Sequence, residues 1–211
     1  MFNRISKSST AARVILIRHG ETEWNAFGKF QGQTDINLSE KGRNQAKKLA
    51  EFFPVENLDA IYSSDLSRAF ETASFVAKKF NLNVTKEPAF REMNFGLWEG
   101  LTYNEINEKW PEELKNFYTR PDLLKVPEGE TFVKLQTRAV KRVYELVEKH
   151  RGGAFAIFSH GGVLRTILAD ALEMPLKNIW RIKHENTSVS IVSYGEAPFV
   201  ECFNNVSHLM K

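Results

Sequence analysis

The sequence predicts an α/β fold, a three-layer α/β/α sandwich in which helices cover both faces of a mostly parallel central sheet. Short β-branched apolar runs alternate with longer segments of helical periodicity along most of the 211 residues. Such alternation is typical of parallel sheets with covering helices. The composition agrees, because 42% apolar and 26% charged residues are ordinary values for a globular domain.

The first half of the chain contains two strand–helix pairs. Residues 13–17 form an apolar run suited to a strand buried on both faces, and residues 58–62 form a second such run. Ser39 opens a segment whose apolar positions recur at helical spacing until Pro54. Asp65 is expected to cap a second helix of the same kind. The order of elements is therefore β, α, β, α.

The second half begins with a weak strand at residues 83–86. Residues 101–128 are polar with scattered aromatic side chains, which predicts the short helices of a cap inserted beside the sheet. A long helix is expected at residues 131–149, followed by a buried strand at residues 154–158 and another helix at residues 161–171. Two closing strands follow, at residues 189–194 and 199–204. No repeat or long linker divides the sequence, so we expect a single domain over residues 13–211 after a loose polar arm at residues 1–12.

Charge and cysteine content exclude several classes of function. The formal net charge is only +3, which is too small to indicate a nucleic-acid or membrane partner but is compatible with a small anionic ligand. The single cysteine, Cys202, rules out an internal disulfide framework. No stretch approaches the roughly eighteen apolar residues of a membrane span. We therefore expect a cytoplasmic protein without nucleic-acid or membrane partners, and the sequence leaves a homodimer open.

Two of the predicted strands end in similar residues. The first strand leads into RHGETEWN, which begins at Arg18, and the strand at residues 154–158 leads into SHGG, which begins at Ser159. Because carboxyl ends of parallel strands lie at one edge of a sheet, the two His-Gly pairs are expected to meet there. Glycine lets the backbone approach a ligand, and the helix starts that follow offer free N–H groups to an anion. The pattern favours a phosphate site.

Charged side chains at the same edge strengthen this prediction. Arg18 and Arg68 can each present a planar guanidinium to two phosphate oxygens, so together they can hold a dianion. Glu92 follows the third predicted strand and can fall at the same carboxyl edge. A carboxyl group therefore completes the set.

Five blocks resemble, in order, the histidine phosphatase superfamily, also called the phosphoglycerate mutase-like family. They are RHGETEWN, FQGQTDINLSEKG, IYSSDLSRAFETA, REMNFGLWEG and FSHGGVLR, and five blocks in order are far more specific than RHG alone. The resemblance implies three catalytic residues: His19, which accepts the phosphoryl group, Glu92, which donates a proton, and His160. It also implies a phosphate pocket made of Arg18, Asn25, Arg68 and His160. Weaker substrate contacts are implied nearby, at Gln31, Gly32 and Gly161.

These roles have physical requirements. His19 can attack phosphorus only as a neutral imidazole, with its other ring nitrogen donating to a neighbour. His160 is expected to be protonated, so that it holds the phosphate together with the arginines and the Asn25 amide. Glu92 must give a proton to the leaving alkoxide, after which its carboxylate can activate water. The scheme needs no metal or other cofactor, and the histidines show no metal-ligand spacing.

Several residues also have plainer interpretations. The other histidines and the cysteine are expected to be structural: His150, His184, His208 and Cys202. Glu99 lies in the same block as Glu92 and is an alternative carboxylate, but Glu92 matches the family position after Arg91. The weaker substrate contacts could be ordinary turn residues, and the aromatic side chains of the cap could simply form its core.

The five blocks are compatible with three functions. A mutase typically has a longer insertion with adjacent arginines, whereas residues 101–128 carry only scattered basic side chains. REMNFGLWEG and SHGGVLR most resemble the broad-specificity and α-ribazole phosphatases. We therefore predict a metal-independent phosphomonoesterase that hydrolyses small phosphorylated metabolites through a phosphohistidine. The alternative is a 2,3-bisphosphoglycerate-dependent phosphoglycerate mutase. A non-catalytic phosphate-binding module is less favoured, because both the nucleophile and the acid are present.

Overall fold

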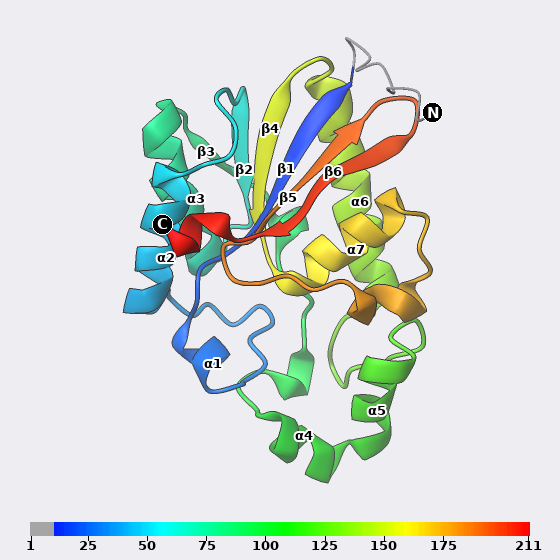
Figure 1. Cartoon of the computed structure of the whole chain (residues 1–211). Helices are drawn as coiled ribbons and strands as arrows, with labels where there is room; N and C mark the ends of the chain where they lie inside the picture. Colours follow the sequence, from blue (N-terminus) through cyan, green and yellow to red (C-terminus); the bar gives the residue numbers. More distant parts are fainter. Residues whose placement is uncertain (1–10) are drawn as a thin grey trace.

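The protein is organised around a six-stranded sheet, which Figure 1 shows in a computed structural model that describes residues 11–211. The strand order is β3-β2-β4-β1-β5-β6. The strands are β1 (Ala12–Arg18), β2 (Ala60–Ser63), β3 (Val84–Lys86), β4 (Ala154–Ser159), β5 (Val189–Tyr194) and β6 (Pro198–Asn205). Strands β1 to β4 run parallel to one another, whereas β5 pairs antiparallel with both β1 and β6. The prediction of a mostly parallel sheet is therefore confirmed.

Within residues 11–211, the connections contain α-helices and short 3₁₀ helices. The α-helices are α1 (Glu23–Ala26), α2 (Glu40–Glu51), α3 (Ser67–Phe80), α4 (Tyr103–Lys109), α5 (Pro111–Thr119), α6 (Phe132–Lys149) and α7 (Gly161–Ala171). The 3₁₀ helices are Pro88–Phe90, Gly96–Trp98, Leu176–Arg181 and Ser207–Met210. The helices predicted at residues 131–149 and 161–171 are confirmed to within one residue.

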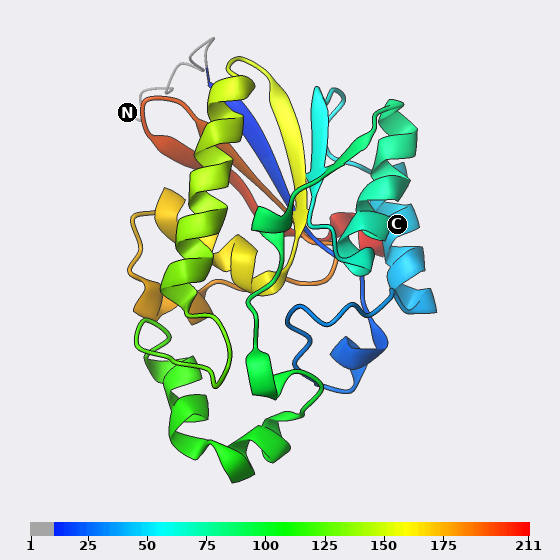
Figure 2. The same ribbon diagram turned by 180° about the vertical axis from the view of Figure 1, so that it is seen from behind.

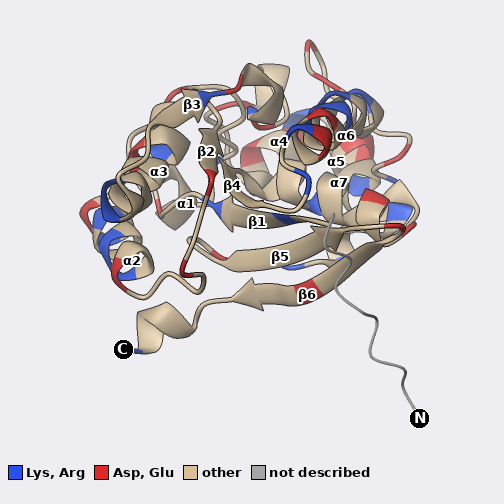
Figure 3. Ribbon diagram, turned by 90° about the horizontal axis from the view of Figure 1, so that it is seen from above, with Lys and Arg blue, Asp and Glu red and all other residues tan. Residues whose placement is uncertain are grey.

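Helices cover both faces of the sheet. Seen from above, α2 and α3 lie on one side of the strands and α6 and α7 on the other (Figure 3), and the view from behind shows the same arrangement (Figure 2). Alternate residues of β1 enter the two cores: Ile15 and Ile17 pack with α2 and α3, and Val14 and Leu16 pack with α6 and α7. All four side chains are fully buried, as expected for a central strand. The predicted three-layer sandwich is confirmed.

The two helices on the α2/α3 face begin differently. Ser39, which was predicted to open this segment, caps α2, and its Oγ accepts from the Gly42 N–H at 3.0 Å. The predicted cap at Asp65 is wrong, because the residue before α3 is Leu66 and makes no side-chain cap. The Asp65 carboxylate instead accepts from Nε and Nη2 of Arg91 at 2.7 and 2.5 Å. A bidentate guanidinium is a stronger partner than a backbone N–H, so Asp65 ties the start of α3 to the segment before Glu92.

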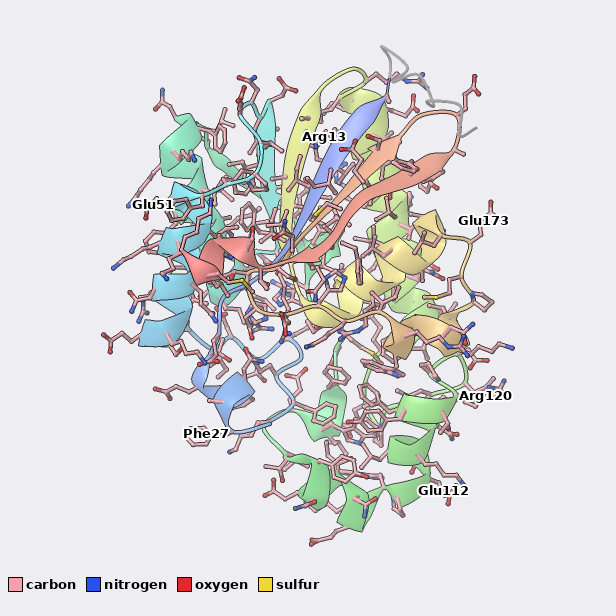
Figure 4. All side chains as sticks on the ribbon, viewed as in Figure 1. Arg13, Phe27, Glu51, Glu112, Arg120 and Glu173 are labelled. Atoms are coloured by element: carbon pink, nitrogen blue, oxygen red, sulfur yellow. The ribbon has the colours of Figure 1, made fainter. Side chains whose placement is uncertain are left out.

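The predicted cap segment, residues 101–128, contains α4 and α5 beyond the carboxyl ends of β1 and β4 (Figure 1). Leu114 and Phe117 of α5 are buried, while Glu112 and Arg120 project outward (Figure 4). This amphipathic helix therefore packs one face toward the sheet domain and exposes the other.

The beginning of the described chain differs slightly from the prediction. β1 starts at Ala12, so that residue of the predicted arm belongs to the sheet, while residues 1–10 lie outside the described residues. The division into an arm and a single domain stays a prediction. Within residues 11–211, no helix combines the length and apolar character needed to cross a bilayer.

Candidate active site

Strand pairing brings His19 and His160 together. β1 and β4 are adjacent and parallel, with Arg18 opposite Ser159. His19 and His160 directly follow these two strands and therefore lie at the same point of the carboxyl edge of the sheet. The two ring centroids are 5.1 Å apart and the ring planes are inclined by 57°. The expected convergence of two imidazoles is present in the structure.

The His19 ring is held as a neutral imidazole with one free nitrogen. Its Nδ1 lies 2.7 Å from the Gly20 carbonyl oxygen, and because a carbonyl can only accept, Nδ1 carries the hydrogen and Nε2 keeps a lone pair. Burial lowers the pKa of His19 well below its ordinary value, and the charges of Arg68 and Arg18 lower it further. His19 therefore meets the requirement for a nucleophile at neutral pH.

The His160 ring differs from the expectation of a cation. Its Nε2 lies 2.9 Å from the hydroxyl of Ser64, the residue directly after β2. Burial lowers the pKa of His160 well below its ordinary value, with Arg68 and His19 adding to the effect. The protein groups alone thus favour a neutral ring, because desolvation and nearby positive charge both oppose protonation. A proton on His160 requires a dianion beside it to offset the arginines.

Arg18 and Arg68 are each anchored by main-chain carbonyls. Arg18 donates from Nη1 to His184 O at 2.7 Å, and Arg68 donates from Nη1 and Nη2 to Thr34 O and Gly32 O at 2.9 and 2.7 Å. Burial lowers the pKa of each guanidinium to about 10, so both stay cationic at neutral pH. The Nε atoms of both are buried without a hydrogen-bond partner among the described residues, as is His160 Nδ1. The two unpaired guanidinium N–H groups suit an anion.

Asn25 presents its amide nitrogen to the same region. Its Oδ1 accepts from the backbone N–H and hydroxyl of Thr22 at 3.1 and 3.2 Å, and from Asn186 Nδ2 at 3.4 Å. These bonds occupy the oxygen and fix which way the amide points. Asn25 lines the cavity described below, so its NH₂ group is available to an anionic oxygen.

Glu92 reaches the site from the edge of the sheet. Its carboxylate oxygens accept from the backbone N–H groups of Met93 at 2.9 Å and of Gly162, in the first turn of α7, at 3.0 Å. Its backbone carbonyl accepts from Arg138 Nη2 at 3.0 Å and Gln33 Nε2 at 3.1 Å. These four bonds place the carboxyl group beside the residue pair that follows His160.

Glu99, the alternative carboxylate, is occupied by the loop at residues 31–34. It accepts from the N–H groups of Gln33, Thr34 and Phe95 at 2.8, 2.9 and 3.1 Å, and from the Thr34 hydroxyl at 2.5 Å. Gly32 has a φ of +53°, and a Cβ there would lie 1.9 Å from Glu99 Oε1. Because the carbonyls of Gly32 and Thr34 hold Arg68, Glu99 supports the phosphate pocket indirectly, and Glu92 remains the candidate acid.

These residues surround a cavity of about 250 Å³. The predicted site residues in its wall are Arg18, His19, Asn25, Gln31, Gly32, Arg68, Glu92 and Gly161. His160 is fully buried and is not part of the wall, although its ring contacts that of His19. The structure therefore collects the predicted residues at one place, with His160 beneath the surface of the cavity.

The sequence-based prediction missed several residues of the wall. They include two basic side chains and several aromatic ones: Lys29, Arg165, Phe30, Phe95, Phe132 and Trp180. A signal for Arg165 existed, because it lies four residues after Gly161 and so on the same face of α7. No comparable signal marked Trp180, which comes from the Leu176–Arg181 turn.

Gly20 has a role other than the expected approach to a ligand. It is absent from the cavity wall, and a Cβ at this position would lie 2.5 Å from the carbonyl oxygen of Gly42 in α2. The Gly20 N–H donates to the hydroxyl of Thr72 in α3 at 3.1 Å. Gly20 therefore lets the end of β1 pack against the two helices that cover it.

The remaining histidines have structural surroundings. His150 Nε2 lies 2.9 Å from the Tyr62 hydroxyl, and His208 Nε2 lies 3.0 Å from the Thr187 hydroxyl. His184 is buried and contacts the ring of Phe203, with centroids 5.7 Å apart. Among residues 11–211, no three His, Cys, Asp or Glu side chains are grouped so that they could hold a metal ion.

Comparisons with known proteins agree with this arrangement. Residues 14–205 match the family model of the histidine phosphatase superfamily (branch 1). The chain is 34% identical over 184 residues to Phosphoserine phosphatase 1 of Hydrogenobacter thermophilus, covering 87% of each. It is 35% identical over 209 residues to the Metal-independent phosphoserine phosphatase of Arabidopsis thaliana, covering 97% of this chain and 86% of that one. The structure of Bacillus stearothermophilus YhfR matches with a TM-score of 0.89 at 35% identity, covering 94% of this chain and 100% of that one. The chain belongs to the histidine phosphatase superfamily.

Proposed function

We propose that the protein is a metal-independent phosphomonoesterase that hydrolyses small phosphorylated metabolites through a phosphohistidine at His19. One observation carries the proposal: a neutral His19 with a free Nε2 lines a cavity whose wall also contains Arg18 and Arg68. A nucleophile facing fixed positive charge suits attack on a phosphate dianion.

The first half-reaction transfers the phosphoryl group to the protein. His19 Nε2 attacks phosphorus in line with the ester oxygen, so that an N–P bond forms and the P–O ester bond breaks. Arg18, Arg68 and the Asn25 amide hold the charged oxygens during this step. Glu92 gives its proton to the departing oxygen, which leaves as an alcohol.

The second half-reaction returns the protein to its starting state. The Glu92 carboxylate takes a proton from a water molecule, whose oxygen attacks phosphorus. The N–P bond breaks and its electron pair returns to His19 Nε2, so inorganic phosphate leaves. His160 contributes through its ring contact with His19, and the dianion can supply the charge that makes its protonation favourable.

The substrates expected first are phosphorylated hydroxy acids and amino acids. Two relatives carry the name phosphoserine phosphatase, and the cavity of about 250 Å³ is smaller than the roughly 300–1,000 Å³ of sites for drug-sized ligands. We expect the protein to act in the cytoplasm, in keeping with its single cysteine.

Phosphate release from p-nitrophenyl phosphate in excess EDTA tests the proposal. A parallel coupled assay follows conversion of 3- to 2-phosphoglycerate with and without 2,3-bisphosphoglycerate. Hydrolysis that survives the chelator, without mutase turnover, supports the phosphatase. Efficient conversion stimulated by bisphosphoglycerate would establish the mutase instead, and binding of phosphate esters without any turnover would establish a non-catalytic module.

A further inference from the structure

Arg165 is a third arginine in the cavity wall, and its position is fixed from two sides. Its Nε donates to the Ile182 carbonyl at 2.8 Å. Its guanidinium carbon lies 5.1 Å from the centroid of the Trp180 ring, which is within the range of a cation–π contact. Trp180 is held in turn by a hydrogen bond from its Nε1 to the Phe117 carbonyl in α5. The guanidinium is therefore preorganised between α7 and the cap.

The outer nitrogens of Arg165 have no acceptor among residues 11–211. No carboxylate in that part of the chain forms an ion pair with it, and its Nη atoms make no hydrogen bond there. Other partly buried arginines are paired: Arg91 with Asp65, Arg138 with Glu130 and Arg142 with Glu87. An arginine held in place while its two Nη groups stay unpaired is suited to bind an anion from outside the chain.

The charges of the wall call for more than a phosphate. Arg18, Arg68 and Arg165 place three guanidinium groups around the cavity, Lys29 adds an ammonium group, and Glu92 is the carboxylate in the wall. A phosphate dianion offsets two of these four positive charges, which leaves positive charge for a second anionic group of a ligand. Arg165 Nη1 lies 2.8 Å from the point that a Cβ of Gly161 would occupy, so its fork lies next to the first turn of α7.

We propose that Arg165, braced by Trp180, binds a carboxylate of the substrate and makes the enzyme selective for short phosphomonoesters that carry a carboxylate. This inference rests on the proposed function, and it assigns Arg165 a role in specificity. The planar fork matches the two oxygens of a carboxylate. The small cavity keeps that carboxylate within a few bonds of the phosphate.

A matched pair of substrates tests the assignment. 3-Phosphoglycerate and glycerol 3-phosphate differ in a carboxylate against a hydroxymethyl group, so their kcat/KM ratio reports the carboxylate alone. We expect the wild-type protein to favour 3-phosphoglycerate by about tenfold or more, and Arg165→Gln to lose roughly 10- to 100-fold on that ester, mostly through KM. The loss on glycerol 3-phosphate should stay below about threefold.

Two further variants separate the role of the fork from that of general charge. Arg181→Gln removes a positive charge from an exposed position in the turn that contains Trp180 and should leave the ratio unchanged. Arg165→Lys keeps the positive charge but lacks the planar guanidinium. It should reduce the logarithm of the kcat/KM ratio between the two esters by about half. If Arg165→Gln is poorly folded by circular dichroism, Arg165→Lys decides the question. Equal losses on both esters, or a wild-type protein without preference, would overturn the assignment.

Binding distinguishes failure of this inference from failure of the proposed function. Titration calorimetry of both esters is carried out on His19→Ala and on His19→Ala/Arg165→Gln. We expect tighter binding of 3-phosphoglycerate to the first variant and no preference in the second. If the wild-type protein hydrolyses no phosphomonoester, the proposed function fails while the calorimetric preference still decides the role of Arg165. Hydrolysis without any carboxylate preference would retain the phosphatase and reject this role.

Discussion

Exchanging Glu99 and Glu92, separately, for glutamine should produce opposite patterns of stability and activity. Glu99 accepts three hydrogen bonds from the loop that holds Arg68 and a fourth from the Phe95 N–H. In Glu99→Gln the amide oxygen can keep about half of these bonds, and the amide NH₂ group faces the other donors. Bonds to charged acceptors contribute roughly 1.5–3 kcal/mol each. Since the loop is only partly buried, we expect a total loss of about 2–4 kcal/mol.

That loss corresponds to a decrease in melting temperature of roughly 5–10 °C for a chain of this length. The activity of Glu99→Gln should fall only about tenfold in kcat/KM, because Arg68 is loosened and not removed. Glu92→Gln keeps one of its two carboxylate hydrogen bonds and should be closer to wild type in stability. Its kcat should fall by roughly 10²–10⁴-fold, as expected when a general acid is lost.

Differential scanning calorimetry and initial rates on glycerol 3-phosphate, whose alcohol leaving group needs the proton, measure both effects on the same preparations. The comparison controls for charge, because each variant removes one carboxylate from the same block of sequence. A Glu99→Gln protein as stable as wild type would refute the proposed support of the loop. Equal activity losses in the two variants would refute the assignment of Glu92 as the acid.

Three further predictions concern stability. Burial lowers the pKa of His184 to about 3, so between about pH 6.5 and 3 His184 stays unprotonated in the native state but gains a proton in the unfolded state, and stability falls as pH falls. Measured by urea unfolding, the free energy of unfolding of His184→Leu should change less steeply with pH than that of the wild type, by up to about 1.4 kcal/mol per pH unit. Equal slopes would contradict this. A double-mutant cycle of Asp65→Asn and Arg91→Gln should give a coupling free energy of about 0.2–1 kcal/mol, a modest value because the Arg91 side chain is 40% exposed. A helix-capping role for Asp65 would instead leave the two changes additive, with no coupling. Gly32→Ala should lower the free energy of unfolding by more than about 2 kcal/mol, because φ at this position is +53° and the new Cβ would overlap the Glu99 carboxylate. A change in that free energy within about 0.5 kcal/mol would show that the loop adjusts freely.

The fold was predictable where local pattern and burial agree. The run that became β1 is apolar on both faces, and the structure places it in the centre of the sheet with its alternate residues in two cores. The cap at Ser39 was predictable for the same reason, because its partner is three residues away. Asp65 failed as a cap because its partner Arg91 is distant in sequence, and no local signal announces such an ion pair.

The candidate site was predictable to the extent that topology determines it. Parallel strands with similar ends imply that His19 and His160 meet, and they do. The charge state of His160 was not predictable, because it depends on how deeply the ring is buried and on Arg68 beside it. The clamp of Arg165 and Trp180 was missed because it forms between α7 and a turn that follows it. The sequence pattern therefore predicts which helices and strands form better than it predicts which side chains contact one another between them.

Trapping the covalent intermediate tests the central claim most directly. The protein is mixed with a ³²P-labelled phosphomonoester, quenched in base within a single turnover, and digested for mass spectrometry. The mechanism predicts an acid-labile phosphoryl group on the peptide that contains His19, absent from His19→Ala. A phosphoryl group on another residue, or rapid turnover with no labelled protein at any time, would contradict it.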